Sequence, residues 1–292
     1  MISPFTLHKP DSVESASALL GRYGDDARVL AGGSELILLM KLGLSSSKHI
    51  VDIKGISNLN GMHFDKDKQA LRIGSLVDHR TLETSTTVRE HFPLIAEMER
   101  HLANIRIRNV GTLAGNICFA EPHADPAALL LAYGAKVTAK TAKRQRTIAV
   151  ADFFVDYYKT ALEPDEILTE IEIPKPVKNS TGAYLRFCPA ERPMATAAAI
   201  IGWKDGAAHD VRLAMGCVGP TPIAAGEVGD ALNKKSADEI SATALEIGER
   251  AAWLCDPLED MWGSVEYKRQ IVKTLVSRAL AQACRAGATL EN

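Results

Sequence analysis

The first third of the chain alternates short apolar runs with amphipathic stretches, a pattern typical of strands that alternate with helices. Asp11, with Glu14 three positions later, predicts a capping-box variant at the start of the first helix, and Gly21 predicts its end. The predicted elements are a helix over 11–21, a strand around Val29, a helix over 34–42 and a strand over 49–53. They favour a small lobe of βαβ type over about residues 1–57.

A second set of alternating elements predicts another lobe over about residues 58–174. Its expected elements are a strand over 71–76, short helices from Asp78 and Pro93, a helix over 125–133, and strands over 136–139 and 167–173. The sequence Pro174-Lys175-Pro176 then interrupts the pattern, because proline lacks the N–H that helices and sheets need. We therefore expect one two-lobed domain over residues 1–174.

Beyond this boundary the pattern changes to strands followed by long helices. The expected strands are 183–187, 196–203 and 211–218, and the expected helices are 237–252 and 264–284. Lys204-Asp205-Gly206 predicts a hairpin turn between two of the strands. Residues 178–292 should thus form a three-stranded antiparallel sheet with helices, and the whole chain an α+β protein.

Composition and charge narrow the class of protein. The 292 residues carry a formal net charge of −2, which gives no reason to expect nucleic acid, and the basic cluster 140–146 is typical of a solvated turn. No apolar run is long enough to span a bilayer, and the first residues lack the features of a signal peptide, so we expect a cytoplasmic location. The five cysteines are far apart and form no metal-binding pattern, which favours free thiols.

Two glycine-bearing turns carry the main functional signal, Leu30-Ala31-Gly32-Gly33-Ser34-Glu35 and Gly111-Thr112-Leu113-Ala114-Gly115-Asn116. The first lies between a predicted strand and a predicted helix. Glycine lets the backbone approach a phosphate, and free N–H groups at a helix start attract the anion. Two such turns in one chain favour a long ligand with an anionic centre, such as a dinucleotide.

Other sites of nucleotide or hydrolytic chemistry are not indicated. The chain has no Gly-x-Gly-x-x-Gly, P-loop, Gly-x-Ser-x-Gly or His-Glu-x-x-His pattern. Five histidines are interpreted as surface or cap residues: His63, His79, His91, His101 and His209. His123 favours a structural role. Asp125 has two open interpretations: an N-cap of the helix that follows, or a carboxylate that accepts hydrogen bonds from ribityl or ribose hydroxyls.

Several segments together resemble the FAD-binding medium subunit of molybdenum hydroxylases, the group of xanthine dehydrogenase and aerobic carbon monoxide dehydrogenase. The segments are Leu30–Leu36 through Met40-Lys41, Gly111–Asn116, Pro122–Pro126, Phe153–Thr160 and Glu166-Ile167-Leu168. The resemblance implies an FAD-binding domain of the PCMH/vanillyl-alcohol-oxidase type and a C-terminal domain of the CO dehydrogenase flavoprotein type. Because neither turn contains histidine, it implies non-covalent FAD.

The resemblance also implies roles for individual residues. The implied FAD-binding residues are Leu30, Ala31, Gly32, Gly33, Ser34, Glu35, Leu36, Thr112, Leu113, Gly115, Asn116, Asp125, Leu168 and Arg186. Leu168 would pack on the isoalloxazine ring, with a core strand residue as the alternative. Arg186 would place a cation near the ring, with a surface strand residue as the alternative. Neither a residue that acts on substrate nor a metal ligand is expected in this chain.

The implied function is electron transfer within a larger assembly. [2Fe–2S] centres of a small partner subunit would pass electrons to FAD, and a large subunit with the molybdenum cofactor would feed those centres. The acceptor would be NAD⁺, a quinone or O₂, and the complex a dimer of heterotrimers. The alternatives are a self-contained FAD-dependent oxidase or dehydrogenase with the same FAD-binding architecture, and a non-catalytic partner-binding protein.

Overall fold

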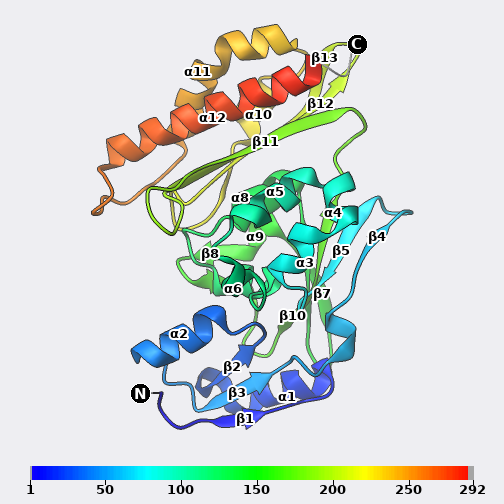
Figure 1. The fold of residues 1–292 in the computed structure, drawn as a ribbon, viewed down its shortest axis with the longest axis vertical. Helices are drawn as coiled ribbons and strands as arrows, with labels where there is room; N and C mark the ends of the chain where they lie inside the picture. Colours follow the sequence, from blue (N-terminus) through cyan, green and yellow to red (C-terminus); the bar gives the residue numbers. More distant parts are fainter. Residues whose placement is uncertain (1, 289–292) are drawn as a thin grey trace.

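The N-terminal lobe is a small parallel sheet with its connecting helices (Figure 1). The computed structural model describes residues 2–288 of the chain. The elements of this lobe are β1 (Thr6–His8), α1 (Val13–Tyr23), the 3-10 turn η1 (Gly24–Asp26), β2 (Ala27–Leu30), α2 (Ser34–Leu42) and β3 (His49–Asp52). The strand order is β1-β3-β2, with both pairs parallel. β2, α2 and β3 form the βαβ unit expected from the sequence.

The caps of helix α1 differ from the prediction. Ser12, not Asp11, is the N-cap, and its side chain forms a reciprocal capping box with Ser15. Gly24 is the C-cap, with φ +49°, so the helix continues through the predicted end at Gly21. The predicted Asp11–Glu14 box is therefore wrong by one residue, because two serine hydroxyls three positions apart satisfy the same amides.

The second lobe is built on an antiparallel sheet. Its elements are η2 (Ser57–Leu59), β4 (Met62–Asp65), β5 (Ala70–Gly74), α3 (His79–Thr84), α4 (Thr86–His91), α5 (Pro93–His101), α6 (Ile105–Arg108), α7 (Leu113–Phe119), α8 (Pro126–Tyr133), β6 (Lys136–Lys140), β7 (Gln145–Ala149), α9 (Val150–Phe153), β8 (Phe154–Asp156), β9 (Lys159–Thr160) and β10 (Ile167–Pro174). The sheet order is β4-β5-β10-β6-β7, while β8 and β9 pair separately. The basic cluster 140–146 includes the turn of the β6–β7 hairpin.

The C-terminal part is an antiparallel sheet covered by two long helices (Figure 1). Its elements are β11 (Ser180–Phe187), β12 (Ala195–Lys204), β13 (Ala207–Gly216), β14 (Ile223–Ala224), α10 (Gly226–Asp230), α11 (Ala237–Trp253) and α12 (Val265–Ala288). The three predicted strands are present, and a short fourth strand, β14, extends the sheet beside β13. Asp205 and Gly206 both have positive φ, as a two-residue hairpin turn requires.

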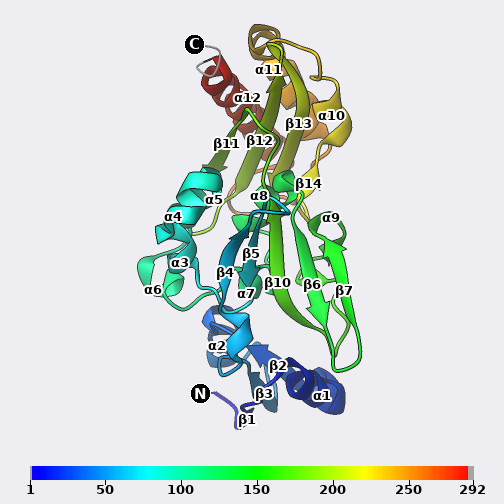
Figure 2. The same ribbon diagram turned by 90° about the vertical axis from the view of Figure 1, so that its right-hand side faces the viewer.

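Strand β12 separates two hydrophobic cores. Ala199 and Ile201 face α11 and α12, whereas Ala198 and Ile200 belong to the core that also contains α7 and α8. Alternate residues of a strand point to opposite faces, and here both faces are covered. The sheet thus lies between the C-terminal helices and the second lobe, as Figure 2 shows from the side.

Within residues 2–288, no helix has both the length and the apolar character needed to cross a membrane.

Candidate cofactor-binding site

The two glycine turns are in direct backbone contact. A Cβ placed on Gly32 would lie 2.0 Å from the carbonyl oxygen of Val110 and 2.8 Å from Cα of Gly111. No side chain fits in that space, so Gly32 is required for the first turn to pack against the second. Gly33 meets a different requirement, since its φ of +81° is in the left-handed region. The turns predicted as separate phosphate loops therefore form one structure.

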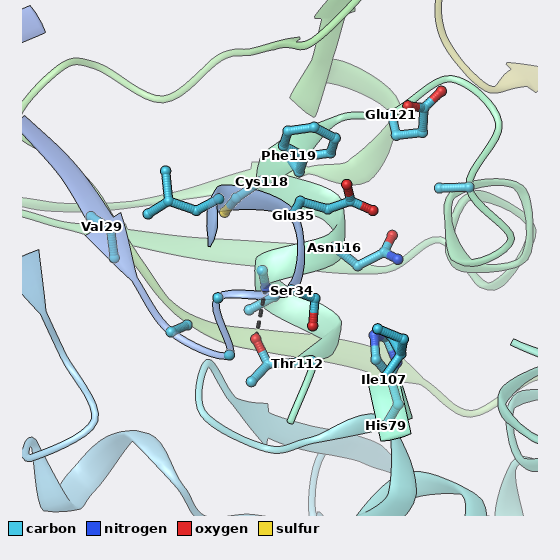
Figure 3. A pocket seen from close by; sticks show the side chains of 18 of the residues that line it. Val29, Ser34, Glu35, His79, Ile107, Thr112, Asn116, Cys118, Phe119 and Glu121 are labelled. Atoms are coloured by element: carbon cyan, nitrogen blue, oxygen red, sulfur yellow. Dashed lines mark hydrogen bonds between the residues drawn. The ribbon is translucent and has the colours of Figure 1, made fainter. Parts of the chain in front are cut away.

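Each turn leads into a helix. α2 begins after Gly33, whose lack of a side chain leaves the first N–H groups of the helix without a side-chain cap. α7 is capped by Thr112, whose hydroxyl accepts a hydrogen bond of 2.9 Å from the N–H of Gly115, the dashed line in Figure 3. Uncapped N–H groups at the start of a helix suit an anionic ligand.

A cavity of about 420 Å³ opens beside the turns. This volume lies in the range of small-molecule and cofactor sites. The N-terminal lobe, the second lobe and the segment 191–193 between β11 and β12 all contribute to its wall. The site therefore exists only where three separate parts of the chain meet.

Three polar side-chain atoms in the cavity wall are buried without a hydrogen-bond partner among the residues that the structure describes. They are Oγ of Ser34, Oγ of Ser75 and Oδ1 of Asn116. Figure 3 shows Ser34 and Asn116 in the same region, on the two helices that follow the turns. Buried polar atoms are normally satisfied, so this group points to a polar ligand. Hydroxyl- and phosphate-rich FAD fits the donors and acceptors present.

Asp125 lies in the cavity wall, at the N-cap position of helix α8. Its side chain makes no capping hydrogen bond; it accepts one of 2.9 Å from the hydroxyl of Tyr184, and Nε of Arg186 lies 3.1 Å from Oδ1. Burial raises the pKa of Asp125, although the charge of Arg186 and the Tyr184 hydroxyl act in the opposite direction. Asp125 thus has the N-cap position that the sequence predicted, but its carboxylate links the second lobe to β11 instead of capping the helix.

A second charged group lies at the cavity between the three parts of the chain. Arg192 contacts Glu35 of α2 at 3.2 Å and Glu121 after α7 at 2.5 Å. Burial raises the pKa of Glu121, but hydrogen bonds from His123 and Tyr158 and the charge of Arg192 outweigh it and lower the pKa to about 2. The Glu35 carboxylate therefore forms an ion pair with Arg192.

His79 was expected at the surface or at a cap, and this prediction is wrong. His79 is only 2% exposed and lines the cavity, and its Nδ1 lies 2.7 Å from Oε2 of the fully buried Glu99. Asp78, immediately before it, is the N-cap of α3. Burial of both partners depends on helix packing between α3 and α5, which the local sequence pattern did not indicate.

Most of the predicted site residues line the cavity. Those with lining atoms are Ala31, Gly32, Gly33, Ser34, Glu35, Leu36, Thr112, Gly115, Asn116, Asp125 and Leu168. Leu168 is also 3% exposed and belongs to the core of the second lobe, as a core strand residue does, and its contact with the isoalloxazine ring stays a prediction.

Three predicted residues lie behind this wall. The side chain of Leu30 packs beneath Gly33, and Leu113 is fully buried in the core of the second lobe. Arg186 is not a lining residue and reaches the cavity through Asp125; its side chain is 19% exposed, and one of its guanidinium nitrogens donates to the carbonyl of His101 at 2.5 Å. The sequence interpretation missed Ser75, His79 and Arg192, none of which lies in a recognisable motif.

Comparison with known proteins identifies the type of chain. Residues 3–176 match the family described as FAD binding domain in molybdopterin dehydrogenase, and residues 191–283 match the CO dehydrogenase flavoprotein C-terminal domain. The carbon monoxide dehydrogenase medium chain of Hydrogenophaga pseudoflava is 32% identical over 288 residues, covering 96% of this chain and 97% of the relative. The 6-hydroxypseudooxynicotine dehydrogenase complex subunit alpha of Paenarthrobacter nicotinovorans is also 32% identical, covering 94% and 92%.

A solved structure gives the same result. One chain of the carbon monoxide dehydrogenase from Hydrogenophaga pseudoflava superposes with a TM-score of 0.91 at 31% identity, covering 98% of this chain and 99% of the other. The chain thus belongs to the FAD-binding medium subunits of molybdenum hydroxylases, the flavoprotein components of oxidoreductase complexes of the CO dehydrogenase and xanthine dehydrogenase type.

Proposed function

We propose that FAD is bound without a covalent link in the cavity beside the two turns. Amides of the first turn and of helix α2 would hold the diphosphate, assisted by the Ser34 hydroxyl, with Asn116 and Ser75 as further polar contacts. Asp125 would accept hydrogen bonds from sugar or ribityl hydroxyls, and Leu168 would supply an apolar ring contact. The three unsatisfied polar atoms in one wall carry this assignment.

In this proposal Leu30, Leu113 and Arg186 support the site from behind. Leu30 fills the space beneath Gly33, and Leu113 anchors the start of α7 in the core. Arg186 holds the Asp125 carboxylate in place. The proposed domain division is residues 1–174, with lobes over about 1–57 and 58–174, and residues 178–292.

The chain would serve as an electron relay within a heterotrimer. Bound FAD would supply reversible two-electron chemistry, with [2Fe–2S] centres of a small subunit as donor and NAD⁺, a quinone or O₂ as acceptor. The relatives' names, a medium chain and a complex subunit, support assembly with other subunits. We propose a dimer of heterotrimers in the cytoplasm; the five free cysteines are consistent with a reducing compartment.

The FAD placement is tested by flavin retention. The chain is purified, incubated with FAD, freed of excess ligand and denatured, and the released flavin is measured. Gly32→Ala should abolish retention, because a methyl group 2.0 Å from the Val110 oxygen forces the turns apart. Gly229→Ala is the matched control: its Cβ would lie 2.6 Å from the Val211 oxygen, neither residue lines the cavity, and FAD should be kept. Equal retention in the two variants would contradict the placement.

The relay function is tested in the assembled complex. Co-expression with small and large subunits of a molybdenum hydroxylase should yield one species containing flavin, iron and molybdenum. In that complex, substrate oxidation should reduce the flavin, whereas the isolated chain with FAD should oxidise no organic substrate. Substrate turnover by the isolated chain would instead favour the self-contained oxidase.

A further inference from the structure

A buried histidine–carboxylate pair stands in the wall of the proposed FAD site. His79 at the start of α3 is 2% exposed, and Glu99 in α5 is 0% exposed. Nδ1 of His79 lies 2.7 Å from Oε2 of Glu99, while Oε1 of Glu99 has no hydrogen-bond partner within residues 2–288. A buried carboxylate is costly unless a positive or hydrogen-bonding group compensates it, and His79 is the group in contact with it.

The pair orients the imidazole toward the second glycine turn. The backbone N–H of His79 donates to the carbonyl of Gly111 at 3.0 Å. A point at the Cβ position of Gly111 would lie 3.2 Å from Cδ2 of His79 and 3.2 Å from the unsatisfied Oγ of Ser34. Because Nδ1 faces Glu99, the Cδ2–Nε2 edge of the ring is the edge that lies beside the turns. Figure 3 shows His79 in the same view as Ser34 and Asn116.

The other basic side chains that line the cavity each have a partner within the protein. Arg192 is paired with Glu35 and Glu121. Arg28 donates to the carbonyls of Asp25 and Ala27. His123 lies 3.5 Å from Glu121. His79 is therefore the basic lining residue that is placed next to both glycine turns.

We propose that His79, positioned by Glu99, binds the diphosphate of the dinucleotide by donating a hydrogen bond from Nε2. With Nδ1 bonded to the buried carboxylate, Nε2 is the ring nitrogen left for the ligand, and a hydrogen bond from an N–H to an ionised phosphate oxygen is among the stronger hydrogen bonds in proteins. Glu99 acts only through His79 and is a positioning residue. The inference rests on the proposed placement of FAD in this cavity.

The test measures ligand affinities of the full chain. The dissociation constant of FAD is determined by fluorescence titration for the wild type and for His79→Gln, Glu99→Gln and the double variant. His79→Gln should weaken FAD binding about 10- to 100-fold, the effect of losing one charge-assisted hydrogen bond. Glu99→Gln should weaken it in the same direction. The double variant should bind no more weakly than His79→Gln, because both changes remove one interaction.

Ligand fragments distinguish a diphosphate contact from a general loss of structure. The affinity for ADP, which carries the diphosphate, should fall by about the same factor as that for FAD, and the affinity for riboflavin, which has no phosphate, should stay unchanged. His63→Gln changes an exposed residue of β4 that does not line the cavity; it is the control and should bind all three ligands as the wild type does. Glu99→Gln is nearly isosteric and replaces His79→Gln in this comparison if the latter lowers the melting temperature.

The outcomes are separable. If the wild type binds FAD, and His79→Gln binds FAD and ADP with the same affinities as the wild type does, the role of His79 is overturned and the FAD site stands. An equal loss for riboflavin and ADP also overturns it, because the effect is then not on the phosphates. A wild type that binds no FAD after reconstitution overturns the FAD placement itself.

Discussion

The hydrogen atom that serves as the side chain of Gly32 is what allows the two turns to touch. The sequence pattern attributed the glycines to close approach of a phosphate. In the structure the nearest group to Gly32 is the Val110 carbonyl, so its first requirement is contact between the turns. Gly33 has a backbone requirement of its own, with φ at +81°. Two neighbouring positions of one motif thus require glycine for different physical reasons.

The lowered pKa of Glu121 predicts how the stability of the protein changes at acid pH. The pKa of Glu121 is lowered from 4.5 to about 2, so the unfolded chain takes up this proton first as the pH falls. Its stabilising contribution should be complete above about pH 4.5 and be lost progressively down to about pH 2. Thermal melting across this range should show a smaller loss for Glu121→Gln than for the wild type. The same slope in both proteins would contradict the assignment.

The residue types at the site could be predicted only where they lie in a motif. Ser34, Asn116 and Asp125 follow or belong to recognisable sequence patterns, and all three line the cavity. Ser75 and His79 come from the end of a strand and the start of a short helix, where serine and histidine are ordinary residues. Their burial results from packing between segments distant in sequence, which local periodicity does not report.

At the scale of elements, the segment between β11 and β12 joins the parts of the molecule around the cavity. Arg192 contacts α2 through Glu35 and the end of α7 through Glu121. The Arg192 side chain is 46% exposed, so each ion pair is expected to contribute only modestly to the free energy that holds these segments together. The segment therefore acts as a weak clasp over one side of the cavity.

Removal of this clasp should speed the release of FAD. Arg192→Ala should raise the dissociation rate about 2- to 10-fold, as expected for the loss of partly exposed ion pairs. Stopped-flow displacement of bound FAD at low salt measures the rate. Arg100→Ala, which removes an exposed pair with Glu97 in α5, is the control and should leave the rate unchanged. A larger ionic-strength dependence in the wild type than in Arg192→Ala would support the same conclusion.

Long periodic elements were predicted well, whereas two of the shortest strands, β1 and β14, were not. The helices around 34–42 and 237–252 and the strands of the C-terminal sheet have clear periodicity and turn signals, and each is present. β1 and β14 have three and two residues, too few for a period to be recognised, and they exist because neighbouring strands offer free edges. Their formation is a tertiary effect.

At the scale of the whole molecule, the C-terminal part completes the second lobe. Ala198 and Ile200 of β12 and Ala214 of β13 belong to the same core as α7 and α8. Tyr184 and Arg186 of β11 satisfy the buried Asp125. The FAD-binding part is therefore not closed without the sheet that follows it.

This dependence predicts the behaviour of a truncated chain. A fragment of residues 2–176 loses the cover of α8 and leaves Asp125 without its partners, which destabilises the region beside the cavity. It should bind FAD at least 10-fold more weakly than the full chain and expose apolar surface. Flavin titration and binding of a hydrophobic dye measure the two effects. Wild-type affinity in a folded fragment would show that the parts are independent.

Strand β12 has a consequence for how this sequence can diverge. Its odd-numbered positions 195–201 face the C-terminal helices, and Ala198 and Ile200 face the second lobe. A volume change at Ala199 must be compensated among α11 and α12, and one at Ala198 among residues near the cavity. Substitutions on the two faces of β12 can therefore be compensated independently of each other. Homologues can change the packing of α11 and α12 while the face toward the second lobe stays constant.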